Sequence, residues 1–93
     1  MPHALDRLGT HQVTVTSAAT RLVDKRQNRI TLTVVKHGTQ DLFYGCNETT
    51  STTSGALLSG TCGTYISIPT TDSLYGIVTA GSLVVSVTET YRA

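Results

Sequence analysis

Two cysteines, Cys46 and Cys62, are the residues of this 93-residue chain best suited to covalent or metal chemistry. Fifteen residues lie between them, and a disulfide that closes a loop of this length stabilises a folded chain by about 3 kcal/mol. Cys46 follows an apolar segment and Cys62 lies in a turn between glycines, so nothing in the pattern brings the two thiols together. We therefore expect two separate thiols, with a disulfide as the alternative.

The histidines and the one Gly-bracketed nucleophile do not form a recognisable reactive site. His3, His11 and His37 are scattered, and none lies at zinc-finger spacing from a cysteine. The segment 60–63, Gly-Thr-Cys-Gly, differs from the Gly-x-Ser-x-Gly elbow that precedes a helix in hydrolases. We expect no metal, no cofactor and no catalytic residue, and a hydrolase that uses Cys62 is the weakest alternative.

The first residues and a glycosylation sequon bear on where the chain works. Asn47-Glu48-Thr49 fits the acceptor sequence for N-glycosylation. The opening MPHALDRLGTHQ lacks the apolar region of a signal peptide, and no stretch approaches the roughly 18 apolar residues of a membrane span. We therefore expect an unused sequon, no membrane contact, and a protein used in the cytosol or released by lysis.

Charge and composition exclude several classes of function. The net charge of +1 at pH 7 gives no broad electrostatic surface for nucleic acid or anionic lipid. At 39% apolar and 14% charged, the chain has too little charge for a disordered or coiled-coil protein. A local basic cluster of Arg21, Lys25, Arg26 and Arg29 is expected to be a solvated turn, with a phosphate or partner contact as the alternative.

Hydrophobic periodicity predicts short β-strands. Apolar and polar residues alternate with a period of two in several segments, which is typical of strands with one buried face. Val and Thr are abundant, and their branched Cβ atoms fit a pleated sheet better than a helix. The residues expected to face the core in the two clearest segments, 28–36 and 82–91, are Ile30, Leu32, Val34, Leu83, Val85 and Val87.

Turn signals separate about seven or eight such strands, and the turns are too short for crossover helices. Strands joined in this way pair mainly antiparallel. Because each strand is apolar on one face only, the sequence predicts an all-β fold, a compact antiparallel β-sandwich or flattened barrel. We expect one domain over residues 13–93, and a flexible N-terminal arm over residues 1–12.

A series of short motifs runs through residues 17–91. In chain order they are Ala19-Thr20 with Leu22-Val23, Asn28-Arg29 with the segment 30–34, Tyr44-Gly45, Thr52-Thr53-Ser54-Gly55, Leu57-Leu58, Tyr75-Gly76-Ile77 and the segment 85–89. Together they resemble the small all-β virion proteins of tailed bacteriophages. Two departures from that pattern are the step Tyr44-Gly45, one residue shorter than the family's Tyr-x-Gly, and Cys46, where an aromatic or apolar residue is more usual.

The resemblance implies a virion component, because members of this family serve as head decoration, cement, fibre-base or tail parts. We therefore expect a bacteriophage capsid decoration or cement protein, not an enzyme, on the outer surface of the virion. It would bind the major capsid protein, form a homotrimer, stabilise the capsomers and be assembled in the host cytoplasm. Interface residues are expected near both chain ends: Leu5, Arg7, Leu8, Tyr91 and Arg92.

The alternative is a head-fibre or tail component that binds a receptor or a glycan. Sugar sites on β-sandwiches often combine exposed aromatic rings with Asp or Asn, and Tyr44, Tyr65 and Tyr75 could serve in this way. With 5% aromatic residues and no Trp, a core or interface role for these tyrosines is the favoured interpretation.

Overall fold

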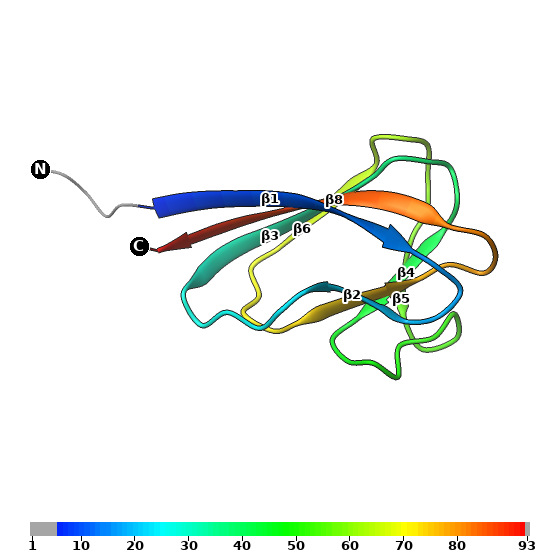
Figure 1. The fold of residues 1–93 in the computed structure, drawn as a ribbon, viewed down its shortest axis with the longest axis horizontal. Helices are drawn as coiled ribbons and strands as arrows, with labels where there is room; N and C mark the ends of the chain where they lie inside the picture. Colours follow the sequence, from blue (N-terminus) through cyan, green and yellow to red (C-terminus); the bar gives the residue numbers. More distant parts are fainter. Residues whose placement is uncertain (1–5, 93) are drawn as a thin grey trace, which may run out of the picture.

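A computed structural model describes residues 6–92. They form eight β-strands, joined by turns and loops, in two four-stranded sheets (Figure 1). The strands are β1 (Asp6–Val15), β2 (Thr20–Val23), β3 (Arg29–Lys36), β4 (Leu42–Gly45), β5 (Ala56–Leu58), β6 (Tyr65–Ile68), β7 (Leu74–Ile77) and β8 (Leu83–Arg92). Every strand pair is antiparallel. The predicted all-β sandwich is confirmed.

Each sheet joins strands from distant parts of the chain. The first, here called sheet A, has the order β1-β8-β3-β6, and the second, sheet B, has the order β2-β7-β4-β5. The last strand, β8, is therefore central and pairs with both β1 and β3. The strands of sheet B have three or four residues, whereas β1 and β8 have ten each, and their paired ends project past β2 in Figure 1.

The core lies between the sheets and comes from alternate residues of their strands, as a period-two pattern requires. Leu83, Val85 and Val87 of β8 are all buried, as predicted, and so are Leu32 and Val34 of β3. Among the residues whose burial the structure describes, the buried apolar side chains are Val15, Leu22, Val23, Leu32, Val34, Leu42, Leu58, Leu74, Val78, Leu83, Val85 and Val87.

Ile30, the remaining residue expected in the core, is exposed instead. β3 pairs with β8 at Arg29 and at Thr31, with a register shift between these two residues. Ile30 is the extra residue of this β-bulge, so the inward position at the start of β3 belongs to Arg29. The sequence pattern could not reveal the bulge, because Ile30 continues the apolar alternation of the strand without a break.

The N-terminal part of the chain also differs from the expectation. β1 begins at Asp6 and pairs with β8 over its whole length, from Asp6 opposite Arg92 to Val15 opposite Leu83. The expected flexible arm over residues 1–12 is therefore wrong for residues 6–12, which extend the domain predicted for residues 13–93. The backbone of β8 supplies hydrogen-bond partners that a weak side-chain pattern does not reveal. Residues 1–5 and 93 lie outside the described residues.

Gly76 of β7 allows two core leucines to approach the backbone of sheet B. A Cβ atom at this position would lie 3.0 Å from Cδ1 of Leu42 and 3.3 Å from Cδ1 of Leu22. These distances are shorter than ordinary van der Waals contacts, so a methyl group here would displace one leucine or the other. The glycine of the Tyr75-Gly76-Ile77 motif thus has a packing role.

We expect Leu42→Ala to destabilise the fold by about 2–5 kcal/mol, because Leu42 is fully buried and its truncation leaves a cavity. The matched control is Leu57→Ala on the neighbouring strand β5, where the side chain is 54% exposed. That change should stay within about 0.5 kcal/mol of the wild type. Urea unfolding measures both, and equal losses in the two variants would contradict this core.

Candidate functional site

A cleft of about 590 Å³ lies at one side of the sandwich, between the edge strands β1 and β2. It is lined by β2, by residues 24–26 of the following turn, by His11 of β1 and by Glu89 of β8. The volume falls within the range of small-molecule sites. The lining is mostly charged, so the cleft suits an ion or a polar partner better than an apolar ligand.

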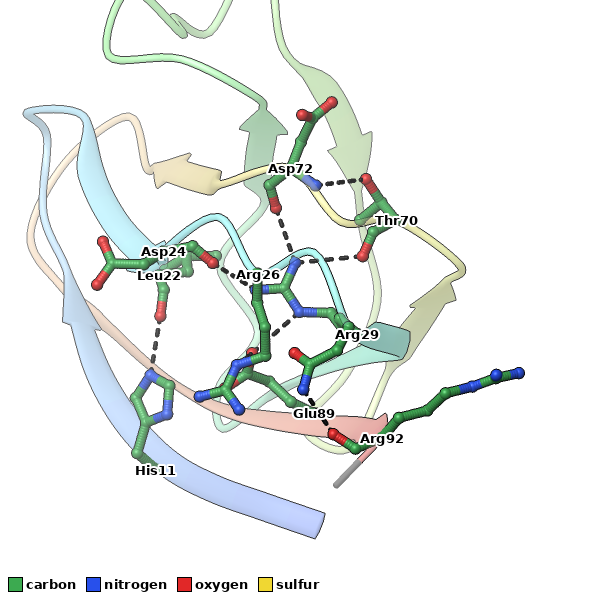
Figure 2. A network of polar contacts seen from close by, with 10 residues as sticks. His11, Leu22, Asp24, Arg26, Arg29, Thr70, Asp72, Glu89 and Arg92 are labelled. Atoms are coloured by element: carbon green, nitrogen blue, oxygen red, sulfur yellow. Dashed lines mark hydrogen bonds and ion pairs between the residues drawn. The ribbon is translucent and has the colours of Figure 1, made fainter. Parts of the chain in front are cut away.

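The buried guanidinium of Arg29 closes the core beside this cleft (Figure 2). Its side chain is fully buried, and Nε donates to Oε1 of Glu89 over 2.9 Å. Nη1 donates to the carbonyl oxygens of Thr70 (3.2 Å) and Asp72 (2.8 Å), and Nη2 donates to the carbonyl oxygen of Asp24. Arg29 therefore joins β8, the β2–β3 turn and the β6–β7 loop through four acceptors.

Glu89 receives a second cation, because Nε of Arg26 lies 3.4 Å from the same Oε1 atom. Arg26 also places Cζ 3.9 Å from the centroid of the Tyr91 ring, a cation–π contact. Its backbone N–H donates to the carbonyl oxygen of Thr71 over 2.9 Å. The turn after β2 is thus held in place by both its backbone and its side chains.

The charges around the cleft do not balance. Four cations line the cleft or lie beside it, whereas only two carboxylates do so. The cations are Arg21, Lys25, Arg26 and Arg29, and the carboxylates are Asp24 and Glu89. Glu89 is shared by two arginines, and Asp24 pairs with Arg21 at 2.6 Å. That hydrogen bond raises the pKa of the exposed Arg21 guanidinium. Within residues 6–92 no carboxylate pairs with Lys25, so the cleft can attract an anionic group.

His11 links the two sheets at the mouth of the cleft. It lies on β1, and its Nε2 donates to the carbonyl oxygen of Leu22 on β2 over 2.8 Å. β1 and β2 belong to different sheets, so this bond bridges the open side of the sandwich.

The prediction that the basic cluster is a solvated turn is only partly correct. Lys25 and Arg21 are exposed, but Arg29 is a core residue.

A second buried cation, Lys36, lies at the opposite end of β3. It has no exposed surface, and Nζ donates to the carbonyl oxygen of Gly60 over 2.9 Å. Its backbone exchanges hydrogen bonds with the same β5–β6 loop, through the carbonyl oxygen of Thr64 and the N–H of Gly63. Inward-facing cations thus hold a loop at each end of β3.

The buried roles of Lys36 and Glu89 were not predicted, although the sequence contains one signal for them. Lys36 is in phase with the core residues Leu32 and Val34, and Glu89 is in phase with Val85 and Val87. A charged side chain at the end of a strand that points between the sheets needs an opposite charge or hydrogen-bond acceptors and donors when the sandwich buries it.

The cysteines lie on separate loops, as expected from the sequence. Both thiols are free and exposed. Leu42 pairs with Leu58, and the antiparallel strands β4 and β5 continue in opposite directions from this pair toward Cys46 and Cys62. The thiols therefore lie at opposite ends of these strands, too far apart for a disulfide.

The polar loop after Cys46 is ordered by its own side chains. Asn47 accepts a hydrogen bond at Oδ1 from the N–H of Thr49 (3.1 Å), and Oγ of Ser51 accepts from the N–H of Thr53 (3.3 Å) and of Ser54 (3.1 Å). Hydroxyl and amide groups replace strand partners here. The side chain of Asn47, the sequon residue, is thus used within a turn.

The expected interface residues gather at one end of sheet A. Arg7 lies opposite Tyr91 and Leu8 opposite Thr90. Leu8 is 71% exposed, and the Arg92 side chain points away from the Arg29 contacts in Figure 2. Tyr91 instead packs within the chain, under Arg26. Leu5 lies outside the described residues.

The three tyrosines proposed for a glycan site do not meet. Tyr65 is exposed on β6 of sheet A, at 64%. Tyr44 packs against the core from β4, and Tyr75 lies on β7 with the opposite strand phase, in sheet B. No single surface therefore combines these rings.

Within residues 6–92, no three His, Cys, Asp or Glu side chains are grouped to hold a metal ion. The same residues contain no helix long and apolar enough to cross a membrane.

Comparison with known proteins bears on the fold alone. No family model and no curated protein matches this sequence. A solved structure of Bacillus endospore appendages, a family of disulfide-linked pili, is similar over 95% of this chain and 87% of its own, with a TM-score of 0.56 and 10% identity. The similarity thus covers the whole sandwich rather than one sheet.

We expect Arg29→Met to destabilise the protein by about 3–5 kcal/mol, because it leaves the Glu89 carboxylate nearly buried with only the longer Arg26 contact. Arg26→Met is the matched control, since its side chain is 38% exposed, and it should cost less than about 1 kcal/mol. Adding Glu89→Leu to Arg29→Met should recover much of the loss. Urea unfolding measures the series, and an Arg29→Met variant as stable as the wild type would contradict the role of this pair.

Both thiols should react with Ellman's reagent in the native protein without a prior reducing step, because both are exposed and far apart. Cys46→Ser and Cys62→Ser should each change the free energy of unfolding by less than about 0.5 kcal/mol. A protein that has no reactive thiols and runs at the mass of one chain on a denaturing, non-reducing gel would reveal the internal disulfide that this fold excludes.

Proposed function

We propose that this protein is a structural component of a multi-copy particle, a capsid decoration or cement protein that binds the major capsid protein on the outer shell. The observation that carries the proposal is the outer face of sheet A, which has no Lys, Arg, Asp or Glu from the row of Leu8 and Thr90 to the row of Thr14 and Val84. Asp6 and Arg92 pair in the next row, at the end of β1 and β8. Protein surfaces usually carry roughly 25–35% charged residues. Exposed apolar side chains on the same face, with no Lys, Arg, Asp or Glu between them, favour contact with another protein.

This uncharged face is built from the outward-facing residues between Leu8 and Thr14 of β1 and between Val84 and Thr90 of β8, together with their neighbours on β3 and β6. Strand register places them in rows across the sheet. The members are Leu8, Thr10, Gln12, Thr14, Thr31, Thr33, Val35, Tyr65, Ser67, Val84, Ser86, Thr88 and Thr90.

Several hydroxyl groups of the uncharged face already bond to one another. Thr10 and Thr88 share a hydrogen bond of 3.1 Å between their Oγ1 atoms, and Thr33 and Ser67 share one of 2.8 Å. Internal pairing reduces the number of polar groups that a docking partner would leave unsatisfied. Leu8, Tyr65 and Val84 add exposed apolar area to the same face. His37 follows β3 at the border of this face, and its Nε2 lies 2.6 Å from Oγ of Ser86. A neighbouring shell protein could therefore cover the surface between these rows without desolvating a Lys, Arg, Asp or Glu side chain.

A second candidate function is that of a subunit in a protein filament or appendage. The similarity to the pilus protein of Bacillus endospores supports it, since the two chains match over nearly their full lengths. Both candidates place many copies of one sandwich in contact with one another or with a scaffold. A receptor- or glycan-binding tail module has less support, because Tyr44, Tyr65 and Tyr75 lie on different surfaces.

Removing the N-terminal dozen residues is a poor test of docking, although the expected arm suggested it. That deletion takes away most of β1, which pairs with β8 over ten residues. Loss of docking would then be inseparable from damage to the fold. Single substitutions on the uncharged face avoid this problem.

We expect Thr33→Lys to reduce the number of copies on purified particles at least tenfold, because it places a charge at the centre of the uncharged face. The control is Leu57→Lys on sheet B, where the side chain is 54% exposed and outside that face. Quantitative mass spectrometry of particles counts the copies, with hundreds expected for the wild type and for Leu57→Lys.

Circular dichroism and thermal melting should show the wild-type fold in both variants. A handful of wild-type copies per particle would favour a tail or fibre part over a decoration protein. Full occupancy by Thr33→Lys, or absence of the wild type from particles, would overturn the proposal.

A further inference from the structure

The outer edge of β1 is the longest unpaired strand edge in the described part of the chain. β1 has ten residues and pairs only with β8. The other three sheet edges, β2, β5 and β6, have three or four residues each. A free edge exposes a row of backbone N–H and C=O groups that can pair with another strand.

Two of the other edges carry features that discourage pairing, and the third, β5, has only three residues. β2 has a register shift between Arg21 and Val23, and β6 is followed at once by Pro69. From Leu8 to Val15, β1 has no Lys, Arg, Asp, Glu or Pro. Charged side chains and prolines are the usual protection of an edge strand, so this edge is open to a partner strand.

We propose that β1 pairs antiparallel with β1 of a second copy of this chain, which joins two A sheets into one sheet of eight strands. An antiparallel edge is complementary to itself, because a two-fold rotation places donors opposite acceptors. The uncharged segment from Leu8 to Val15 brings no like charges together. Another protein would need its own free edge, whereas a second copy supplies one automatically.

The alternation of side chains limits the possible registers. A two-fold axis perpendicular to the sheet pairs residues of the same face, so the numbers of two paired residues sum to an even value. Maximum overlap of residues 6–15 then puts the axis at Thr10 or at His11. In either register the two Thr10 side chains lie about 5–8 Å apart, and part of the exposed Leu8 surface is covered by Gln12 or Thr14 of the partner subunit.

The pairing also extends the uncharged face, which would run without interruption across both copies. This consequence rests on the proposed docking function, but the pairing itself requires only the two free edges. The two ideas fail separately, because pairing is measured on the free chain without particles, where a charge at Thr10 should block pairing and a charge at Thr33 should not.

The test measures the mass of the full chain by light scattering during size-exclusion chromatography. We expect the wild type at twice the 9.9 kDa chain mass, and Thr10→Lys and Thr10→Glu each at the mass of one chain, because like charges meet near the axis. An equimolar mixture of the two variants should return to twice the chain mass, since opposite charges then meet.

Thr33→Lys is the matched control for Thr10→Lys. It makes the same change on the same face and also removes one inter-strand hydroxyl bond, but β3 is two strands away from the edge. It should keep the mass of two chains. A wild type at the mass of one chain, a homotrimer, or a Thr10→Lys protein that stays paired would each overturn the proposal. Recovery in the mixture also excludes misfolding as the cause of the single-variant result.

Discussion

The burial of the Arg29 guanidinium is the constraint on which the closed end of this sandwich depends. A buried cation is tolerated only where its N–H groups find acceptors. Here those acceptors come from β8, the β2–β3 turn and the β6–β7 loop. Because these segments are distant in sequence, the two sheets can close at this end only when all three are in place. The cationic cleft beside Arg29 follows from the same arrangement, since the turn that satisfies Arg29 also carries Lys25 and Arg26.

Most of the fold could be predicted from the sequence because its strands are amphipathic and its turns are marked by Gly, Pro, Asn and Asp. The alternation in β3 and β8 predicted Leu32, Val34, Val85 and Val87 in the core. The bulge at Ile30 could not be predicted, because it depends on pairing with β8 rather than on any residue type. Residues 6–12 of β1 were missed because their exposed polar side chains carry little pattern, and β8 supplies their partners.

The candidate site was less predictable than the fold. Arg21, Lys25, Arg26 and Arg29 were recognised as a cluster, but the sequence could not separate the one buried member from the exposed ones. That distinction depends on Glu89, which is sixty residues from Arg29 along the chain. Burial of the pair gives the cluster a structural role, and it leaves the uncharged face of sheet A and the free edge of β1 as the surfaces best suited to contacts with other molecules.

The pairing of the first strand with the last has a consequence for biosynthesis. β4 and β5 are close in the chain and can pair as soon as both have left the ribosome, whereas β1 has no strand partner until β8 has been translated. Closing so long a loop is slow, and a waiting strand with no charged residue between Leu8 and Val15 is prone to aggregate. The protein should therefore depend on rapid completion of translation, or on a holding chaperone, more than a sandwich whose neighbouring strands follow one another in sequence.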